Sequence, residues 1–97
     1  MSNILEVVDK TVRRIHLSKT QWIHIRKKHP EVENYEEIEE TLKNPLKITS
    51  YKPDQSMEYY YRYFKNKPSP NQYLLVLVKY LNGDGYVIIA YYDKRLK

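Results

Sequence analysis

The 97-residue chain contains no cysteine, 2 glycines, 2 methionines and a single phenylalanine. Without cysteine, it has no disulfide bond, no thiolate nucleophile and no cysteine-based zinc site. Both glycines lie within residues 82–85, which excludes a glycine-rich phosphate loop and a serine nucleophile elbow. No apolar run is long enough to span a bilayer, and the N-terminal residues are too acidic for a secretion signal. We therefore expect a cytoplasmic protein without a membrane partner.

Length and charge indicate one domain with an unevenly charged surface. Residues 1–97, of which 41% are apolar, are enough for a single domain with one core. Within this domain we expect residues 1–10 to form a flexible N-terminal extension. Six of the 12 acidic residues fall within residues 31–40, which contain no Lys or Arg. The rest of the chain contains the other 6 acidic residues and all 17 Lys and Arg, so its formal net charge is +11. This asymmetry favours a polyanionic partner such as RNA, although lysines also serve simply to keep a small domain soluble.

The hydrophobic pattern predicts an α+β domain. A short strand is expected over residues 11–17, and Ser18 is expected to cap a helix from about Lys19 to Lys28. Pro30 disfavours helical geometry at the preceding residue, which ends this helix. A second, acidic helix should follow Asn34 and end near residues 44–45. Strands are expected over residues 47–51, 57–64, 73–81 and 86–92, with a hairpin turn at residues 82–85. We expect the two helices to pack on one face of an antiparallel sheet of four to five strands.

The first helix concentrates proton-transfer groups beside positive charge. His24 and Lys28 are four residues apart and share a helix face, while His29 follows where the helix ends. Imidazole exchanges protons near pH 7, so these histidines are candidates for acid and base catalysis on RNA. Arg26, Lys27 and Lys28 are candidates for binding phosphate. The alternative is that His29 caps the helix end and that the other side chains are simply solvated.

Aromatic residues suggest a surface for nucleotides. Arg62 lies in a tyrosine-rich strand on the same side as Tyr60, where a guanidinium could bind phosphate with two hydrogen bonds or stack on tyrosine. Any of the 11 tyrosines on an exposed sheet face could stack on unpaired bases, although tyrosine also favours strands for packing reasons alone. We expect one or two tyrosines at a ligand site.

A metal centre and a bound cofactor are not expected. The three histidines, His16, His24 and His29, lack the spacings of helical metal ligands, and no thiolate can assist them.

The layout resembles the small nucleases of the barnase-EndoU-colicin-RelE superfamily, particularly its phage- and mobile-element-associated branch. The likeness covers roughly residues 11–94 and is carried by residues 24–25, 28–31, 40–45 and 87–92. It implies a RelE- or barnase-like fold and a metal-independent endoribonuclease, often the toxin of a toxin-antitoxin or phage-conflict system with an acidic antitoxin or immunity protein. One departure is Ala90, where relatives commonly have Ser or Thr.

The resemblance and the residue analysis together give a catalytic hypothesis. His24 and His29 would act as base and acid while a 2′-hydroxyl attacks the adjacent phosphate, and Lys28 and Arg62 would hold that phosphate. Tyr92 would stack or hydrogen-bond near the scissile nucleotide. The side chains expected to bind RNA around this centre are Arg26, Lys27, Tyr60 and Lys94.

Two rivals come from other classes of protein. One is a non-catalytic module of the same fold that binds RNA or the ribosome. The other is a phage accessory domain that uses acidic residues 31–40 to dock on a protein.

Overall fold

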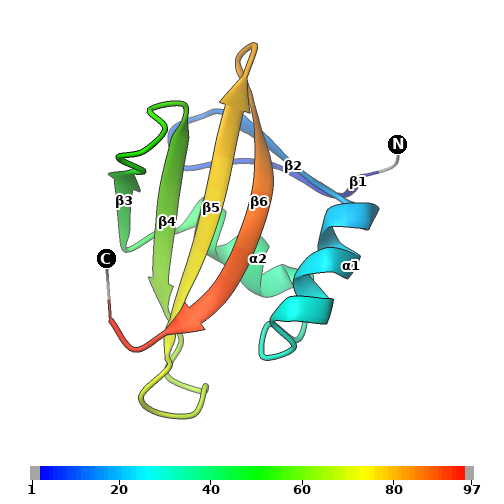
Figure 1. The fold of residues 1–97 in the computed structure, drawn as a ribbon. Helices are drawn as coiled ribbons and strands as arrows, with labels where there is room; N and C mark the ends of the chain where they lie inside the picture. Colours follow the sequence, from blue (N-terminus) through cyan, green and yellow to red (C-terminus); the bar gives the residue numbers. More distant parts are fainter. Residues whose placement is uncertain (1–2, 96–97) are drawn as a thin grey trace.

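A single curved sheet of six strands, accompanied by two helices, makes up the protein (Figure 1). A computed structural model describes residues 3–95. The elements are β1 (Asn3–Val8), β2 (Arg14–Ser18), α1 (Lys19–Lys28), α2 (Tyr35–Lys43), β3 (Lys47–Ser50), β4 (Met57–Tyr63), β5 (Tyr73–Leu81) and β6 (Asp84–Asp93). The strand order is β1-β2-β6-β5-β4-β3. The α+β class is confirmed, but the sheet has six strands and is mixed, because β2 and β6 run parallel.

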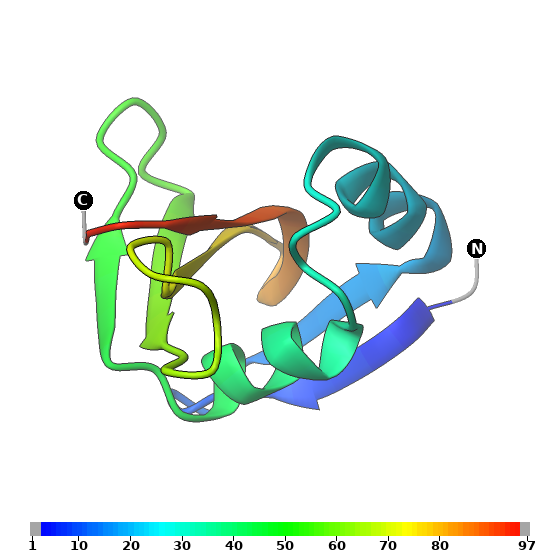
Figure 2. The same cartoon turned by 90° about the horizontal axis from the view of Figure 1, so that it is seen from below.

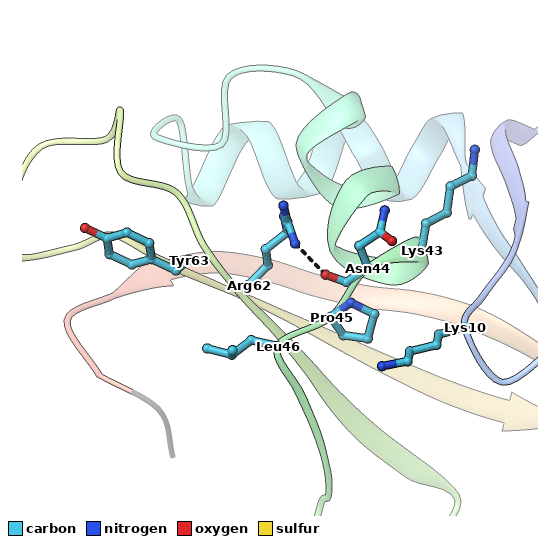
Figure 3. A pocket seen from close by; sticks show the side chains of 7 residues that line it. All are labelled: Lys10, Lys43, Asn44, Pro45, Leu46, Arg62 and Tyr63. Carbon is cyan, nitrogen blue, oxygen red and sulfur yellow. Dashed lines mark hydrogen bonds between the residues drawn. The ribbon is translucent and has the colours of Figure 1, made fainter.

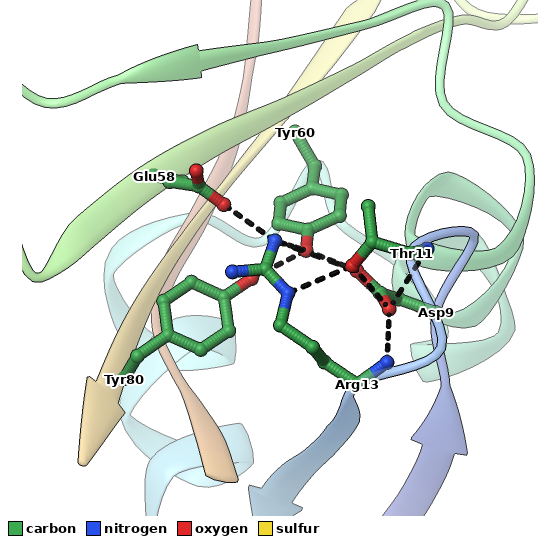
Figure 4. A network of polar contacts seen from close by, with 6 residues as sticks. All are labelled: Asp9, Thr11, Arg13, Glu58, Tyr60 and Tyr80. Carbon is green, nitrogen blue, oxygen red and sulfur yellow. Dashed lines mark hydrogen bonds and ion pairs between the residues drawn. The ribbon is translucent and has the colours of Figure 1, made fainter. Parts of the chain in front are cut away.

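The N-terminal residues differ most from the prediction. The expected flexible extension is wrong for residues 3–8, which form β1 and pair antiparallel with β2. Val7 is buried in the core, and the Asp9 carboxylate accepts hydrogen bonds from the backbone N–H groups of Thr11 and Arg13 at 3.0 and 2.7 Å. The hydroxyl of Tyr60 on β4 also donates to this carboxylate (Figure 4). These bonds fix the β1–β2 turn against the sheet.

The ends of both helices agree with the prediction. The Ser18 hydroxyl accepts a hydrogen bond from the backbone N–H of Gln21 at 3.0 Å, as an N-cap should. The Gln21 side chain does not complete a capping box, because its amide donates to the carbonyl of Ile88 on β6. Helix α1 ends at Lys28, and α2 ends at Lys43. Neither helix within residues 3–95 is long and apolar enough to cross a membrane.

One face of the sheet carries the main core. Helix α2 lies across this face and contacts β1, β4 and β5 (Figure 2). Helix α1 lies beside the β2–β6 part of the sheet instead, so the predicted placement of both helices over one face is only partly correct. Ile25 of α1 and Ile38 and Leu42 of α2 nevertheless join the same core, together with Ile15, Leu17, Tyr60, Leu74, Val76, Val78, Val87, Ala90 and Tyr92.

The hairpin between β5 and β6 follows the sequence prediction. Asn82 and Gly83 have φ angles of 56° and 86°, the left-handed backbone that a two-residue turn between antiparallel strands requires. Gly85 has a different role, because a Cβ there would lie 2.9 Å from the side chains of both Val78 and Tyr80. The pairing of β5 with β6 shifts register between Leu77 and Val78, which is a bulge in the curved part of β6.

Candidate functional site

The second face of the sheet is lined by tyrosines. Directly paired residues share a face, and the pairs Thr49–Tyr59, Tyr59–Leu77 and Leu77–Ile89 define one row across β3, β4, β5 and β6. The next row runs through Lys47, Tyr61, Leu75 and Tyr91, and a third through Tyr63, Tyr73 and Asp93. We call the surface formed by Tyr59, Tyr61, Tyr63, Tyr73 and Tyr91 the tyrosine face. It lies opposite α2.

The rings on the tyrosine face contact one another. The ring centroids of Tyr59 and Tyr61 lie 5.9 Å apart, and the Tyr51 ring meets Tyr59 edge-on at 5.6 Å. Tyr63 and Tyr73 form a further pair at 5.3 Å. Leu75 and Leu77, which lie beside Tyr61 and Tyr59 in these rows, are buried but are not part of the main core. The rings therefore have apolar neighbours of their own.

A hollow of about 490 Å³ opens on the β3 side of this face. Thr49, Tyr51, Tyr59 and Tyr61 line it together with Lys52 from the β3–β4 loop. The Thr49 hydroxyl donates to the Tyr61 hydroxyl at 3.2 Å, which fixes the orientation of that ring. Tyr61 is fully buried, so a planar aromatic ligand such as a nucleobase would meet the half-buried rings of Tyr51 and Tyr59 here.

His29 lies at the opposite margin of the tyrosine face. Its ring faces the Tyr91 ring, with centroids 5.5 Å apart and planes inclined by 31°. Its Nδ1 lies 3.4 Å from a carboxylate oxygen of Glu31, and 27% of the side chain is exposed. Such a carboxylate favours the tautomer with the proton on Nδ1, which leaves Nε2 as a proton acceptor. Helix α1 thus ends before Pro30 as the sequence predicted, and the His29 ring lies against β6.

Tyr91 provides a fixed phenol beside this imidazole. Burial raises the pKa of Tyr91, and a hydrogen bond with Tyr59 acts in the opposite direction. The phenol therefore keeps its proton at neutral pH and can donate a hydrogen bond, but it cannot act as a base there.

Basic side chains lie around the tyrosine face. Lys47 occupies the β3 end of the row that contains Tyr61 and Tyr91, and Lys52 lines the hollow. Lys28 ends α1 directly before His29 and is exposed. Within residues 3–95 none of these three lysines pairs with a carboxylate, so their charge is available to an anion.

Three residues predicted for the RNA site lie on the other face of the sheet. Arg62 pairs with Leu74, and Tyr60 pairs with Val76, which places both side chains on the core face covered by α2. Tyr92 also pairs with Leu74 and is 8% exposed. Contrary to the catalytic hypothesis, these groups do not share a site with His29, because residues one position apart on a strand point to opposite faces.

Tyr60 and Tyr92 form internal hydrogen bonds. Tyr60 is fully buried, and its hydroxyl bonds to Asp9 and Tyr80, so it cannot stack on RNA. The Tyr92 hydroxyl donates to Glu37 of α2 at 2.9 Å. Burial raises the pKa of Tyr60 and of Tyr92, so both phenols stay neutral.

Arg26 also has a structural role instead of the predicted one. Its Nη1 donates to the carbonyl oxygens of Pro30 and Val32 at 2.6 and 2.9 Å. The guanidinium thereby holds the α1–α2 loop in place. His24, Lys27 and Lys94 are exposed.

Ala90 lies in the main core. It is fully buried and pairs with Val76, so a hydroxyl at this position would point away from the tyrosine face. Ile89, one residue earlier, faces the tyrosine face opposite Leu77. The absence of a hydroxyl at position 90 therefore has no direct bearing on that face.

Sequence reasoning missed a buried lysine. Lys67 is 8% exposed, and its ammonium lies 2.9 Å from a carboxylate oxygen of both Glu33 and Glu37 and 5.1 Å from the centroid of the Tyr92 ring. Burial opposes its charge, but hydrogen bonds to Glu37 and Glu33 prevail and raise the pKa of Lys67. Much of the acidic segment 31–40 thus has partners inside the protein.

The tyrosine face itself was only partly foreseen. The prediction of one or two tyrosines at a ligand site did not distinguish Tyr59, Tyr61 and Tyr91 from the other tyrosines of the chain. The period of two in Tyr59, Tyr61 and Tyr63 is the signal that would have separated them from Tyr60.

No protein-family model matches the chain, and no curated protein or solved structure matches it either. Within residues 3–95, no three His, Cys, Asp or Glu side chains are grouped as a metal site requires. The likeness to the barnase-EndoU-colicin-RelE nucleases therefore stays a prediction.

Proposed function

We propose that the protein is an endoribonuclease that needs no metal ion and holds single-stranded RNA on the tyrosine face. The observation that carries this proposal is the position of His29 at the margin of that face, in contact with Tyr91 and held by Glu31. Stacking of bases on tyrosine tolerates many sequences, and basic residues at the margins favour the phosphate backbone.

The reaction follows from the groups present. His29 Nε2 takes the proton of a ribose 2′-hydroxyl while that oxygen bonds to the adjacent phosphorus. The bond from phosphorus to the 5′-oxygen breaks, and water supplies the proton that this oxygen needs. Lys28 and the phenol of Tyr91 stabilise the negative charge that accumulates on the phosphate oxygens. The products are a 2′,3′-cyclic phosphate and a free 5′-hydroxyl.

The spacing across the sheet suits a short RNA segment. Tyr61 and Tyr91 share a row and lie two strands apart, which is roughly 10 Å. A base in the hollow, stacked on Tyr59 beside the buried Tyr61, would therefore lie a few nucleotides from a phosphate at His29. A toxin that acts within a toxin-antitoxin or phage-conflict system, inhibited by an acidic protein that covers the basic margins, is the biological role that this chemistry suits.

A non-catalytic RNA-binding module is the second candidate. It is favoured by one observation: Arg62 and Tyr92, both predicted for catalysis, lie on the opposite face from His29. In that case the tyrosine face would bind RNA without cleaving it.

One experiment separates the two candidates. A labelled single-stranded RNA and the same sequence with 2′-O-methyl groups are incubated with the protein in excess EDTA, and both binding and products are measured. The proposal predicts that both strands bind and that only the unmodified RNA is cut, with a cyclic phosphate end. Binding of both without cleavage supports the second candidate. Absence of binding to either contradicts both.

A further inference from the structure

A second basic site lies at the C-terminal end of α2 and extends to Tyr63 at the margin of the tyrosine face (Figure 3). It is a pocket of about 400 Å³, lined by Lys10, Lys43 and Arg62 with Asn44, Pro45, Leu46 and Tyr63. The pocket has three cationic side chains and no acidic one in its lining. We refer to it as the cationic pocket.

Long-range contacts bring these cations together. The backbone N–H of Lys10, in the β1–β2 turn, donates to the carbonyl of Leu42 at 3.3 Å. Arg62 Nη1 on β4 donates to the carbonyl of Asn44 at 2.7 Å, and the backbone N–H of Leu46 donates to the backbone carbonyl of Tyr61 at 2.7 Å. The β1–β2 turn and β4, which are distant in sequence, are thus both bound to the end of α2, so the arrangement of the pocket is set by the fold.

The positive charge of the pocket is only partly balanced. Lys43 pairs with Glu39 at 2.9 Å, but within residues 3–95 neither Lys10 nor Arg62 has a carboxylate partner. The Nε atom of Arg62 is shielded from solvent and has no hydrogen-bond partner there. The guanidinium has therefore lost hydration at one nitrogen while the carbonyl of Asn44 fixes its orientation.

We propose that the cationic pocket binds a phosphate group. A guanidinium fixed in place and a nearby ammonium match the charge and the acceptor geometry of phosphate, and a pocket of this size holds such a group with part of the molecule that carries it. Arg62, predicted to hold phosphate beside the histidines, does so at this separate place. The site does not depend on RNA cleavage at the tyrosine face. Its phosphate belongs either to a small phosphorylated molecule or to the backbone of RNA.

The test is an NMR titration of the full chain at constant ionic strength. Inorganic phosphate is the first probe, and the Arg62 Nε–H signal and the backbone amides of residues 43–46 report on the pocket. We expect saturable shifts confined to these groups. Arg62→Gln should weaken the phosphate affinity about tenfold or more, and Lys10→Gln roughly threefold. Lys19→Gln, which removes the same charge from α1, should leave the affinity unchanged.

The second probe distinguishes the source of the phosphate. It is a single-stranded RNA hexamer without terminal phosphates, so that only phosphodiesters are present. Shifts with inorganic phosphate alone identify a small phosphorylated ligand, and shifts at the pocket with the hexamer alone identify RNA. The proposal is overturned when neither probe moves the pocket signals. It is also overturned when the affinity stays the same in folded Arg62→Gln and Lys10→Gln proteins.

Discussion

Neighbouring tyrosines on β4 have opposite roles because successive side chains of a strand point to opposite faces. Tyr60 is enclosed by Asp9, Arg13 and Tyr80, whose groups form one network with its hydroxyl (Figure 4). Tyr61, one residue later, lies on the tyrosine face. The network also has an effect on acidity, because burial raises the pKa of Tyr80 to about 12. The phenols of Tyr60 and Tyr80 are therefore neutral, and the hydrogen bond from Tyr60 to Asp9 holds the end of β1 to the sheet.

Tyr60→Phe tests this structural role. Loss of the hydroxyl leaves the buried Asp9 carboxylate with one donor fewer, so the free energy of unfolding should fall by about 1–2 kcal/mol. Tyr63→Phe is the matched control, because its ring is 45% exposed, and it should change stability by less than about 0.5 kcal/mol. Urea denaturation measures both. Equal stability of the two variants would show that the network does not stabilise the fold.

Ala90→Ser tests the assignment of faces on β6. A hydroxyl placed in the main core should lower the free energy of unfolding by about 1–3 kcal/mol, because the neighbours of Ala90 are apolar. It should not increase RNA cleavage, since position 90 points away from His29. Denaturation and cleavage assays on the same preparation provide the measurement. A gain in cleavage would contradict the assignment.

At the residue scale, the sequence predicted local features better than shared sites. The Ser18 cap and the exit of His29 at the end of α1 depend on neighbours within a few residues, and both were foreseen. The separation of Arg62 from His29 depends on which face β4 turns toward α2, and a single strand rich in tyrosine on both sides does not specify that face.

At the scale of elements, the β3–β4 loop forms one wall of the hollow on the tyrosine face. Asp54 organises this loop, because its carboxylate accepts hydrogen bonds from the backbone and hydroxyl of Ser56 at 2.9 and 2.6 Å. The Lys79 ammonium of β5 lies 2.9 Å from the same carboxylate. The hydrogen bonds from Ser56 and Lys79 lower the pKa of Asp54 to about 2.

This depressed pKa gives a pH dependence of known sign. A carboxylate with a lower pKa in the folded state stabilises the protein above its unfolded pKa of about 4, and that contribution is lost as the pH falls toward about 2. Asp54→Asn should therefore be less stable than the wild type near neutral pH, and the difference should shrink between about pH 4 and pH 2. Thermal unfolding at a series of pH values measures it. A difference that is constant with pH would contradict this account of Asp54.

Element boundaries were largely predictable, whereas β1 was not. Helices α1 and α2 and strands β3 to β6 follow from caps, breakers and periodicity. Strand β1 was not predicted, although Leu5 and Val7 alternate with Glu6 and Val8 as a half-buried strand requires. Its pairing with β2 and the parallel contact of β2 with β6 depend on tertiary packing.

At the scale of the whole molecule, residues outside 31–40 carry a net charge of +11, and some of their basic side chains gather at two places on the surface. Lys28, Lys47 and Lys52 lie around the tyrosine face, and the cationic pocket collects a different set. The acidic segment is partly neutralised within the protein, with Glu33 and Glu37 bound to Lys67. RNA binding should therefore combine stacking with a salt-dependent contribution from the lysines.

Two variants separate these contributions. Tyr59→Leu should weaken RNA binding by about 1–3 kcal/mol and leave its salt dependence unchanged, because a stacking surface is lost without any charge. Lys47→Gln should reduce the slope of log affinity against log salt by about 0.7, as expected for one phosphate contact to a single strand. Fluorescence anisotropy at several salt concentrations provides both quantities. A change of slope in Tyr59→Leu alone would contradict the proposed surface.

Cleavage of single-stranded RNA in excess EDTA by His29→Gln and His24→Gln proteins tests the central claim most directly. Both variants lose an imidazole from the same helix region, but the His29 ring contacts Tyr91 of the tyrosine face, whereas His24 is exposed on α1. Under single-turnover conditions, the account predicts that His29→Gln slows cleavage by about 10²–10⁴-fold, while His24→Gln stays close to the wild type. Equal rates for a folded His29→Gln protein and the wild type, or a greater loss in His24→Gln, would contradict it.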